Sequence, residues 1–153
     1  MPITDTPLRY PGGKTQMTPL VLDIVHTNGL AQGFYCEPFA GGAGIACRLL
    51  VSGAVSEVSI NDIDRAIYAF WYSVLNEPDQ LCELIERTPV TMNEWRRQRA
   101  VYLRQEEADI ADLGFATFFL NRTNRSGIIN GGVIGGEKQT GEWGIDARRR
   151  PVQ

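Results

Sequence analysis

Hydrophobic and polar positions along the first sixty residues change period in the order expected for a strand, a helix and a second strand. The apolar and aromatic run at residues 33–37 predicts the first strand, and residues 57–61 predict the second. Between them, residues 44–51 have helical spacing behind a turn rich in glycine. An earlier helical pattern covers residues 15–27. This order predicts an α/β fold with two neighbouring strands.

The pattern then becomes helical until about residue 121. Apolar residues recur at helical spacing in stretches that predict helices at residues 64–75, 79–87, 95–104 and 110–121. Thr91 and Glu94 have the spacing of a capping box, which marks the start of the third of these helices. Beyond Asn121 the chain is polar, basic and rich in glycine. We expect a flexible or hairpin-like region there rather than core.

The glycine-rich turn that holds Gly41, Gly42 and Gly44 is the clearest indication of a binding site. Glycines at such a turn accept positive φ and let a ligand approach the backbone. About 20 residues later, Asp62 ends the second predicted strand, where nucleotide-binding sheets place the acidic residue that holds a ribose. The glycines lack the spacing of the dinucleotide fingerprint. A nucleoside without phosphates therefore fits better than a pyrophosphate.

A second glycine turn precedes Lys14 and Thr15. The sequence Gly-Lys-Thr suggests a P-loop, but the position of that motif's first glycine is Leu8, and no apolar strand precedes it. Two interpretations of Lys14 stay open. It either binds a carboxylate ligand beside the first amides of a helix or belongs to a plain helix cap.

Composition indicates one globular domain with one core, because the chain has 153 residues, of which 43% are hydrophobic and 22% charged. No apolar run approaches the roughly 20 residues that a membrane helix needs. Residues 1–5 also lack the features of a signal peptide, so we expect a cytoplasmic protein without membrane contact. Cys36, Cys47 and Cys82 are expected to be reduced core thiols. With one histidine, His26, a metal site is not expected.

Charge is distributed unevenly although the net charge is only −3. Residues 1–86 carry a net charge of −6, and residues 87–153 carry +3. The division suggests an acidic ligand-binding half and a second half that could meet a polyanion. A solvated helix face would explain the same charges, so both interpretations stay open.

Four motifs occur in order along the chain. They are Pro-Leu-Arg-Tyr-Pro-Gly-Gly-Lys at residues 7–14, Glu-Pro-Phe-Ala-Gly-Gly-Ala-Gly at 37–44, Asn-Asp-Ile-Asp at 61–64 and Phe-Leu-Asn-Arg-Thr-Asn-Arg-Ser-Gly at 119–127. Together they resemble the Dam-type adenine-specific DNA methyltransferases, which use S-adenosylmethionine. The resemblance extends from residue 7 to about residue 148.

This resemblance implies roles for the matching residues. Those expected to bind S-adenosylmethionine are Tyr10, Gly12, Gly13, Lys14, Glu37, Phe39, Gly41, Gly42, Gly44, Asp62 and Ile63. Among them, the N-terminal motif would hold the methionine end, Asp62 the ribose hydroxyls, and Ile63 would lie against the adenine. Those expected to contact double-stranded DNA are Asn121, Arg122, Asn124, Arg125 and Lys138.

The chain also departs from the family pattern. The family acts on a flipped adenine with an Asp-Pro-Pro-Tyr element at the end of its fourth strand. The sequence has eight prolines and no two are adjacent, so that element is absent and no catalytic residue can be assigned. The strand that lies beside strand one in the family sheet is not predicted either. A second chain, or self-association, is expected to cover that exposed strand.

The predicted fold is therefore α/β, an incomplete Rossmann-like S-adenosylmethionine-dependent methyltransferase sheet with helices, followed by the start of a DNA-recognition region. We expect a cofactor-binding part at residues 1–107 and a truncated recognition part at residues 108–153. The preferred hypothesis is an incomplete adenine-specific DNA methyltransferase that is inactive alone. The alternatives are a non-catalytic cofactor- or DNA-binding remnant, half of a split methylase completed by a partner chain, and a nucleotide-binding protein of unrelated role.

Overall fold

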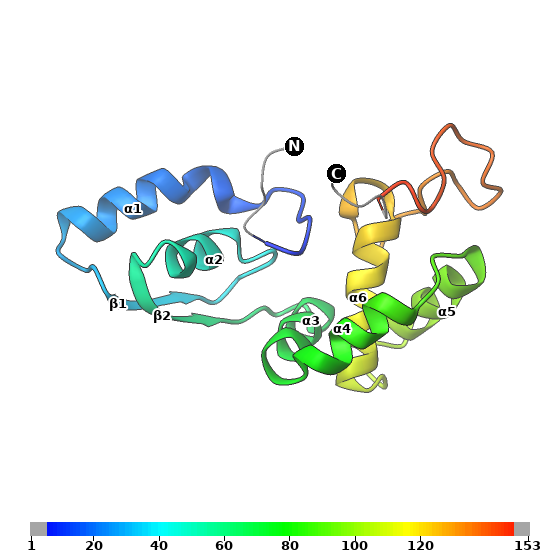
Figure 1. The fold of residues 1–153 in the computed structure, drawn as a ribbon, viewed down its shortest axis with the longest axis horizontal. Helices are drawn as coiled ribbons and strands as arrows, with labels where there is room; N and C mark the ends of the chain where they lie inside the picture. The colour runs from blue at the N-terminus through cyan, green and yellow to red at the C-terminus, as the bar shows by residue number, and fades with distance from the viewer. Residues whose placement is uncertain (1–5, 149–153) are drawn as a thin grey trace. The chain divides into compact units, whose positions relative to one another are not determined.

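The computed structural model describes residues 6–148, which form two compact units that divide between Ile63 and Asp64. Unit 1, which ends at Ile63, contains both strands, and unit 2, which begins at Asp64, is helical (Figure 1). The described residues thus form an α/β protein with six α-helices and a two-stranded parallel sheet. Residues 1–5 and 149–153, on which the expectations of a missing leader and of a premature ending partly rest, lie outside the described part.

Unit 1 is a strand–helix–strand unit preceded by a helix. Its elements are η1 (Lys14–Met17), α1 (Thr18–Thr27), β1 (Gly33–Glu37), α2 (Gly44–Val51) and β2 (Val55–Ile60). The strands run parallel, with Phe34 opposite Glu57 and Glu37 opposite Ile60. The bounds of β1 and α2 are those predicted, whereas β2 begins two residues earlier and the first turn of the predicted N-terminal helix is a 3-10 helix.

Helix α2 packs on one face of this sheet and α1 packs against α2, and together they form a small apolar core. Its buried residues are Ile45, Leu49, Ala54 and Val55, and the half-buried residues packed against them are Val21, Leu22, Tyr35 and Val58. Burial raises the pKa of the Tyr35 phenol, and the nearby Glu37 carboxylate raises it further. Alternation along β1 directs Tyr35 to this core, whereas its neighbours Phe34 and Cys36 are exposed.

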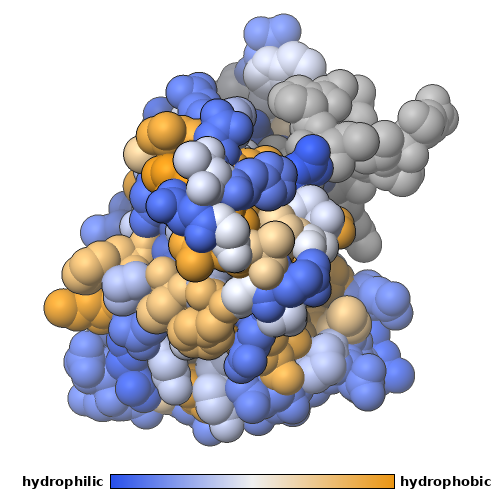
Figure 2. Space-filling view, turned by 90° about the vertical axis from the view of Figure 1, so that its left-hand side faces the viewer, coloured by the Kyte–Doolittle hydropathy of each residue, from blue (hydrophilic) through white to orange (hydrophobic). Residues whose placement is uncertain are grey.

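Within the described part of unit 1, no helix covers the opposite face of β1. Phe34 is 61% exposed, and Cys36 is exposed as well. The prediction that the cysteines are core thiols is therefore wrong for Cys36, and also for Cys82, which is exposed on α4. Within the described part of the chain none of the three cysteines forms a disulfide. Figure 2, which faces the side of the molecule where α1 lies in Figure 1, shows several apolar areas between hydrophilic ones.

Unit 2 is a group of helices built around α6. Its elements are α3 (Arg65–Asn76), α4 (Pro78–Arg87), α5 (Met92–Leu103), α6 (Ile110–Thr123) and η2 (Arg125–Gly127). Helix α6, yellow in Figure 1, packs against α3 and α5. Gly114 allows the close approach to α3, because a Cβ there would lie 2.2 Å from Ser73 Oγ and 2.6 Å from the Ala69 carbonyl oxygen. The predicted boundary after residue 107 falls inside this unit, between α5 and α6.

Short polar side chains fix where the helices of unit 2 begin. Asp64 accepts a hydrogen bond from the Ala66 amide at 2.9 Å, and Asp109 accepts one from the Ala111 amide at 2.9 Å. Thr91 accepts one from the Glu94 amide at 3.2 Å, as the capping-box spacing predicted. These caps explain why the sequence pattern located the helix starts to within about three residues.

The segment after α6 is irregular but not excluded from the interior. An antiparallel bridge joins Asn124 to Val133, and Ile129, Val133 and Ile145 are 9%, 1% and 8% exposed. The expectation of a hairpin-like region agrees with the bridge, whereas the expectation that the region contributes no core is wrong. Its apolar residues are few, but contacts distant in sequence bury them.

Candidate cofactor cavity and nucleic-acid surface

A cavity of about 500 Å³ lies in unit 1, at the end of β1 where the chain turns into α2. Its lining includes ten of the eleven residues predicted to bind a cofactor: Tyr10, Gly12, Gly13, Lys14, Glu37, Phe39, Gly41, Gly42, Gly44 and Asp62. The eleventh, Ile63, is 87% exposed and does not line the cavity. Three motifs separated in sequence therefore converge here, because parallel strands end at the same edge of a sheet.

The bend between β1 and α2 points a backbone amide at the predicted ribose partner. Gly41 has φ of +49°, a conformation that glycine adopts without strain, and its amide donates a hydrogen bond to Asp62 Oδ2 at 2.8 Å. Ala43 also has positive φ, at +48°. The Ala40 amide donates to the Asn61 carbonyl at 2.9 Å, which ties the bend to the end of β2. The carboxylate of Asp62 thus faces the bend and not the solvent side of the strand.

Side chains of the N-terminal segment, not open space, lie closest to the glycines of the bend. A Cβ on Gly41 would lie 2.9 Å from Cε1 of the Tyr10 ring, and one on Gly44 would lie 2.2 Å from Thr15 Oγ1. The Thr6 hydroxyl donates a hydrogen bond to the Gly42 carbonyl. The glycines were expected to let a ligand approach. In this conformation they let residues 6–15 approach, and Gly41 and Gly42 are buried beneath that segment.

Lys14 connects the N-terminal segment to the end of β1. Its Nζ lies 3.2 Å from Glu37 Oε1 and donates a hydrogen bond to the Phe39 carbonyl at 2.5 Å. Glu37 is 5% exposed, and its Oε2 accepts a hydrogen bond from the Ala46 amide in the first turn of α2 at 3.3 Å. A carboxylate at a helix N-terminus stabilises that helix. Lys14 and Glu37 therefore hold three segments together around the cavity.

The two asparagines predicted to contact DNA are buried in unit 2. Asn121 and Asn124 are each 0% exposed. The Asn121 amide donates to the Gly127 carbonyl at 2.8 Å, and the Asn124 amide donates to the carbonyls of Ile128 at 3.1 Å and Ile129 at 2.7 Å. Both side chains are used to shape the loop, so the assignment of these two residues to DNA contact does not fit this conformation.

Two residues of α5 also shape this loop, and they were not singled out from the sequence. Trp95, 3% exposed, donates its indole N–H to Asn124 Oδ1 at 2.7 Å. Arg99 donates to the Gly131 carbonyl at 3.1 Å, and its guanidinium lies 5.2 Å from the centre of the Trp95 ring. A tryptophan in an otherwise arginine-rich helix was the available signal. It did not indicate a partner 29 residues away.

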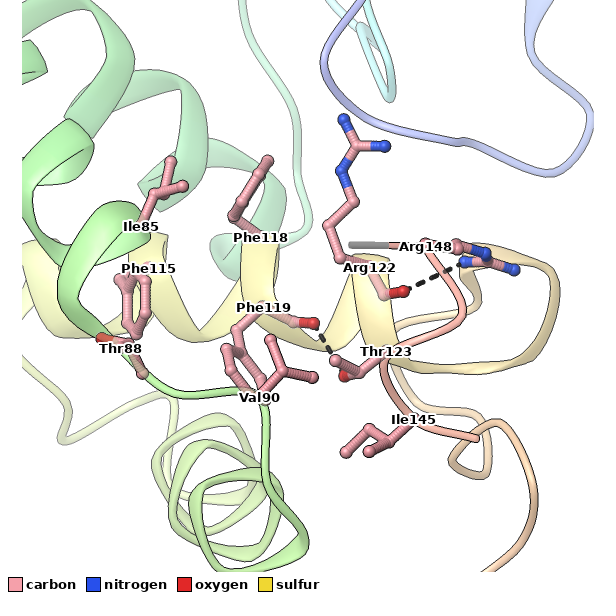
Figure 3. Close-up of a pocket in the computed structure, with 10 residues that line it drawn as sticks. All are labelled: Ile85, Thr88, Val90, Phe115, Phe118, Phe119, Arg122, Thr123, Ile145 and Arg148. Carbon is pink, nitrogen blue, oxygen red and sulfur yellow. Dashed lines mark hydrogen bonds between the residues drawn. The ribbon is translucent and has the colours of Figure 1, made fainter. Parts of the chain in front are cut away.

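The three basic residues predicted to contact DNA differ in their exposure to solvent. Arg125 and Lys138 are exposed and line a second, open hollow of about 560 Å³. Arg122 is half-buried, and its guanidinium lies 5.3 Å from the Phe118 ring centre. Figure 3 shows Arg122 and Phe118 extending from the same side of α6. Arg125 and Lys138 are thus placed to meet a polyanion from solution.

A third cavity, drawn in Figure 3, lies between α4, α6 and the segment around Ile145. Its volume of about 180 Å³ is below the roughly 300–1,000 Å³ of typical ligand sites. The Thr123 hydroxyl donates to the Phe119 carbonyl at 2.8 Å, and Arg148 donates to the carbonyls of Asn121 at 3.1 Å and Arg122 at 3.5 Å. This cavity is therefore a poor candidate for a ligand site.

The comparisons with known proteins identify the class. The model of one family, the D12 class N6 adenine-specific DNA methyltransferases, matches residues 10–130. The match covers most of the chain, including both glycine turns, Asp62 and the Asn121–Gly127 segment. The chain therefore belongs to this family of adenine-specific DNA methyltransferases, as the resemblance of its four motifs predicted. Comparison with curated proteins gives no match.

Two searches over the described residues bear on other classes of site. No helix there is both long and apolar enough to cross a bilayer. No three His, Cys, Asp or Glu side chains in that part of the chain come together as a metal site requires.

Proposed function

We propose that unit 1 binds S-adenosylmethionine and that unit 2 binds DNA, as parts of the machinery that methylates adenine N6. The observation that carries this proposal is the convergence of ten predicted cofactor residues on one cavity of about 500 Å³. In this interpretation unit 1 is the first part of a Rossmann-like methyltransferase sheet. Family membership supports the cofactor, because this family of methyltransferases generally uses S-adenosylmethionine.

The chemistry of the cavity suits a nucleoside that carries an amino acid. Asp62 already accepts a hydrogen bond from the Gly41 amide, and a carboxylate has sites for several donors. Ribose hydroxyls would be further donors to Asp62. Lys14 and Glu37 add a cation and an anion to the same lining, which suits a ligand with both an ammonium and a carboxylate group. Phe39, 68% exposed beside the bend, adds an apolar surface.

Asp62 provides the direct test of the cofactor site. Asp62→Ala is expected to weaken S-adenosylmethionine binding by about 1–3 kcal/mol, because the hydroxyls of the ligand lose their acceptor. Asp62→Asn keeps an acceptor for the Gly41 amide while removing the charge, so it separates the ligand contact from the shape of the bend. Titration calorimetry measures the affinity of both variants for S-adenosylmethionine.

Asp23 gives a matched control, because it is an exposed carboxylate on α1 outside the cavity lining. Asp23→Ala should bind S-adenosylmethionine as the unsubstituted chain does. Equal affinities for Asp62→Ala and Asp23→Ala would remove Asp62 from the proposed site, provided that circular dichroism shows both variants folded.

Arg125 and Lys138 are the residues that we propose for DNA contact, with Arg122 as a further candidate on the Phe118 face. Each phosphate contact that is lost should reduce the slope of log affinity against log salt by about 1. Arg125→Ala and Lys138→Ala are each expected to show this change in duplex binding measured by fluorescence anisotropy. Arg87→Ala, on exposed α4 with Glu83 as its partner, should leave the slope unchanged. If Arg87→Ala changes the slope equally, these two cations have no special role.

The second candidate is a split methylase, and the unpaired edge of β1 favours it. In the described residues β1 pairs with β2 alone, while Phe34 and Leu30 are 61% and 53% exposed. An unpaired strand edge beside exposed apolar side chains is a template for another strand. In this version a second polypeptide, or a second copy of the chain, adds a strand beside β1.

A further inference from the structure

The open hollow lined by Arg125 and Lys138 is also lined by a tryptophan that is largely exposed, Trp143. Trp143 is 58% exposed, whereas the other two tryptophans, Trp71 and Trp95, are 7% and 3% exposed. An indole ring left in water loses the favourable burial that tryptophan usually contributes. A large aromatic ring exposed in a hollow of about 560 Å³ is typical of a contact surface for a ligand.

The backbone that carries Trp143 is held in place although its side chain is exposed. A Cβ on Gly135 would lie 2.6 Å from the Trp143 carbonyl oxygen, and one on Gly141 would lie 3.1 Å from Gly135 Cα. Gly135 has φ of +81°. Glycine at position 135 permits this close approach of the two segments of the loop, so the backbone at Trp143 is held close to Gly135.

Gln139 ties the same loop together from inside. Its Nε2 donates to the carbonyls of Ile134 at 2.8 Å and Gly136 at 2.7 Å, and its Oε1 accepts from the Ile145 amide at 2.9 Å. Ile145 is buried. The loop is therefore a built structure with its own hydrogen bonds, anchored to the interior of unit 2.

The charges around the ring limit the class of ligand. Arg125 and Lys138 line the hollow together with the exposed carboxylates of Glu137 and Glu142. The Arg125 guanidinium lies beside the loop, since a Cβ on Gly136 would be 3.7 Å from its Nη2. Two cations, two anions and one aromatic face match a ligand that has a flat ring, an amino group and a phosphate. The cations suit the phosphates of a nucleic acid, and the carboxylates add hydrogen-bond acceptors that phosphates alone would not need.

We propose that this hollow binds an unpaired nucleotide of single-stranded DNA. Its base stacks on Trp143, its exocyclic amino group donates to Glu137 or Glu142, and its phosphates lie near Arg125 and Lys138. Stacking on an aromatic side chain requires an exposed base face, which paired bases within a duplex do not offer. A carboxylate accepts from the amino group of cytosine, and thymine has no such group. The proposal rests on the DNA binding proposed for unit 2 and adds a strand-specific site to it.

The test uses the full chain with two single-stranded probes of equal length, oligodeoxycytidine and oligothymidine, and a duplex. Oligodeoxycytidine is expected to quench the tryptophan emission and to bind more tightly than oligothymidine. Trp143→Ala should weaken oligodeoxycytidine binding by roughly 5- to 100-fold, the range for loss of one stacked base. Trp143→Phe should keep the affinity, measured by anisotropy of a labelled probe, while abolishing the change in emission.

Two further variants assign the contacts. Glu137→Ala combined with Glu142→Ala should remove the preference for deoxycytidine over thymidine. Tyr68→Ala, which removes a 41% exposed aromatic residue from α3, should change neither affinity nor preference. Thermal denaturation is not expected to distinguish Trp143→Ala from the unsubstituted chain, because the exposed ring packs against little.

The outcomes separate this inference from the proposal on which it rests. Equal binding of the two single-stranded probes, or unchanged affinity in Trp143→Ala, would overturn the nucleotide site. Binding of the duplex without binding of either single strand would overturn it too while leaving the DNA function of unit 2 intact. Failure to bind any of the three probes would remove both.

Discussion

Lys14 and Glu37 were predicted to contact a cofactor, and the structure gives them a second, structural role. Both were expected to contact a cofactor, and both line the cavity. The structure also places them in an ion pair that joins the N-terminal segment to the start of α2. Changing either residue therefore affects the fold of unit 1 as well as ligand binding.

Lys14→Met is expected to destabilise unit 1. It leaves the Glu37 side chain, 6% exposed, without its cation, and an unpaired buried charge is strongly unfavourable. The Lys14 side chain is 42% exposed, so solvent screens the pair, and the expected loss is about 1–3 kcal/mol, less than for a fully buried pair. Urea denaturation followed by circular dichroism measures it.

Two controls separate charge from packing in this pair. Adding Glu37→Gln to Lys14→Met should recover part of the stability, since no buried charge then remains. Arg87→Ala removes an exposed pair, with side chains 80% and 55% exposed, and should cost only about 0–1 kcal/mol. If Lys14→Met costs no more than Arg87→Ala, the ion pair does not hold unit 1 together.

The spacing of residues predicted which of them gather around the cavity of unit 1, but it did not predict that the two asparagines are buried. Glycine turns and a carboxylate at a strand end are local features, so the sequence indicated Gly41 and Asp62 directly. Asn121 and Asn124 lie beside arginines in a polar run, which is typical of a surface. Their burial results from Trp95 and from the fold of their own loop, and no local pattern carries that information.

At the scale of elements, the loop between Asn124 and Val133 depends on one side chain. Asn124→Ala would leave the Trp95 indole N–H and two loop carbonyls without this partner. Unsatisfied buried polar groups cost about 1–3 kcal/mol each. The variant is expected to lower the melting temperature, to change the Trp95 emission and to weaken duplex binding, because Arg125 lies in the loosened loop.

Asn130 offers the matched control for this prediction. It is the same residue type in the same loop but is exposed, and exposed substitutions usually change stability by no more than about 0.5 kcal/mol. Asn130→Ala should melt as the unsubstituted chain does. Equal melting temperatures for the Asn124→Ala and Asn130→Ala variants would show that the network does not stabilise the loop.

Secondary structure was predictable where local chemistry sets it and less so elsewhere. Caps at Asp64, Thr91 and Asp109 fix helix starts, and of these the Thr91 cap was predicted from the sequence as part of a capping box. The interior position of Val133 was missed because glycines surround it. Val133 is buried where an antiparallel bridge pairs it with Asn124. This bridge lies in the irregular segment that follows α6 along the chain.

At the scale of the whole molecule, the uneven charge does not follow the two units. Residues 1–63 carry a net charge of −2 and residues 64–153 carry −1, whereas the two halves considered from the sequence carry −6 and +3. The change of sign therefore occurs within unit 2, after α4. Its basic part contains α5 and the loop that holds Arg125 and Lys138, the two residues that we propose for DNA contact.

The chain alone is expected not to methylate DNA. Adenine's amino group needs acceptors and a stacking ring supplied by the Asp-Pro-Pro-Tyr element, and the sequence contains no adjacent prolines. A methylation-sensitive restriction digest of DNA incubated with the purified chain and S-adenosylmethionine measures this. Protection by the chain alone would refute the prediction. Protection that requires added cell extract would instead support the split methylase with a partner beside β1.

The Tyr10 ring, which lies over the backbone of Gly41, sets a limit on how fast unit 1 can capture its ligand. A nucleoside that touches this backbone must arrive after the ring has swung away. The observed rate of complex formation should therefore rise with ligand concentration and then reach a plateau equal to the frequency of that swing. In Tyr10→Ala, stopped-flow mixing should give a rate that keeps rising in proportion to concentration.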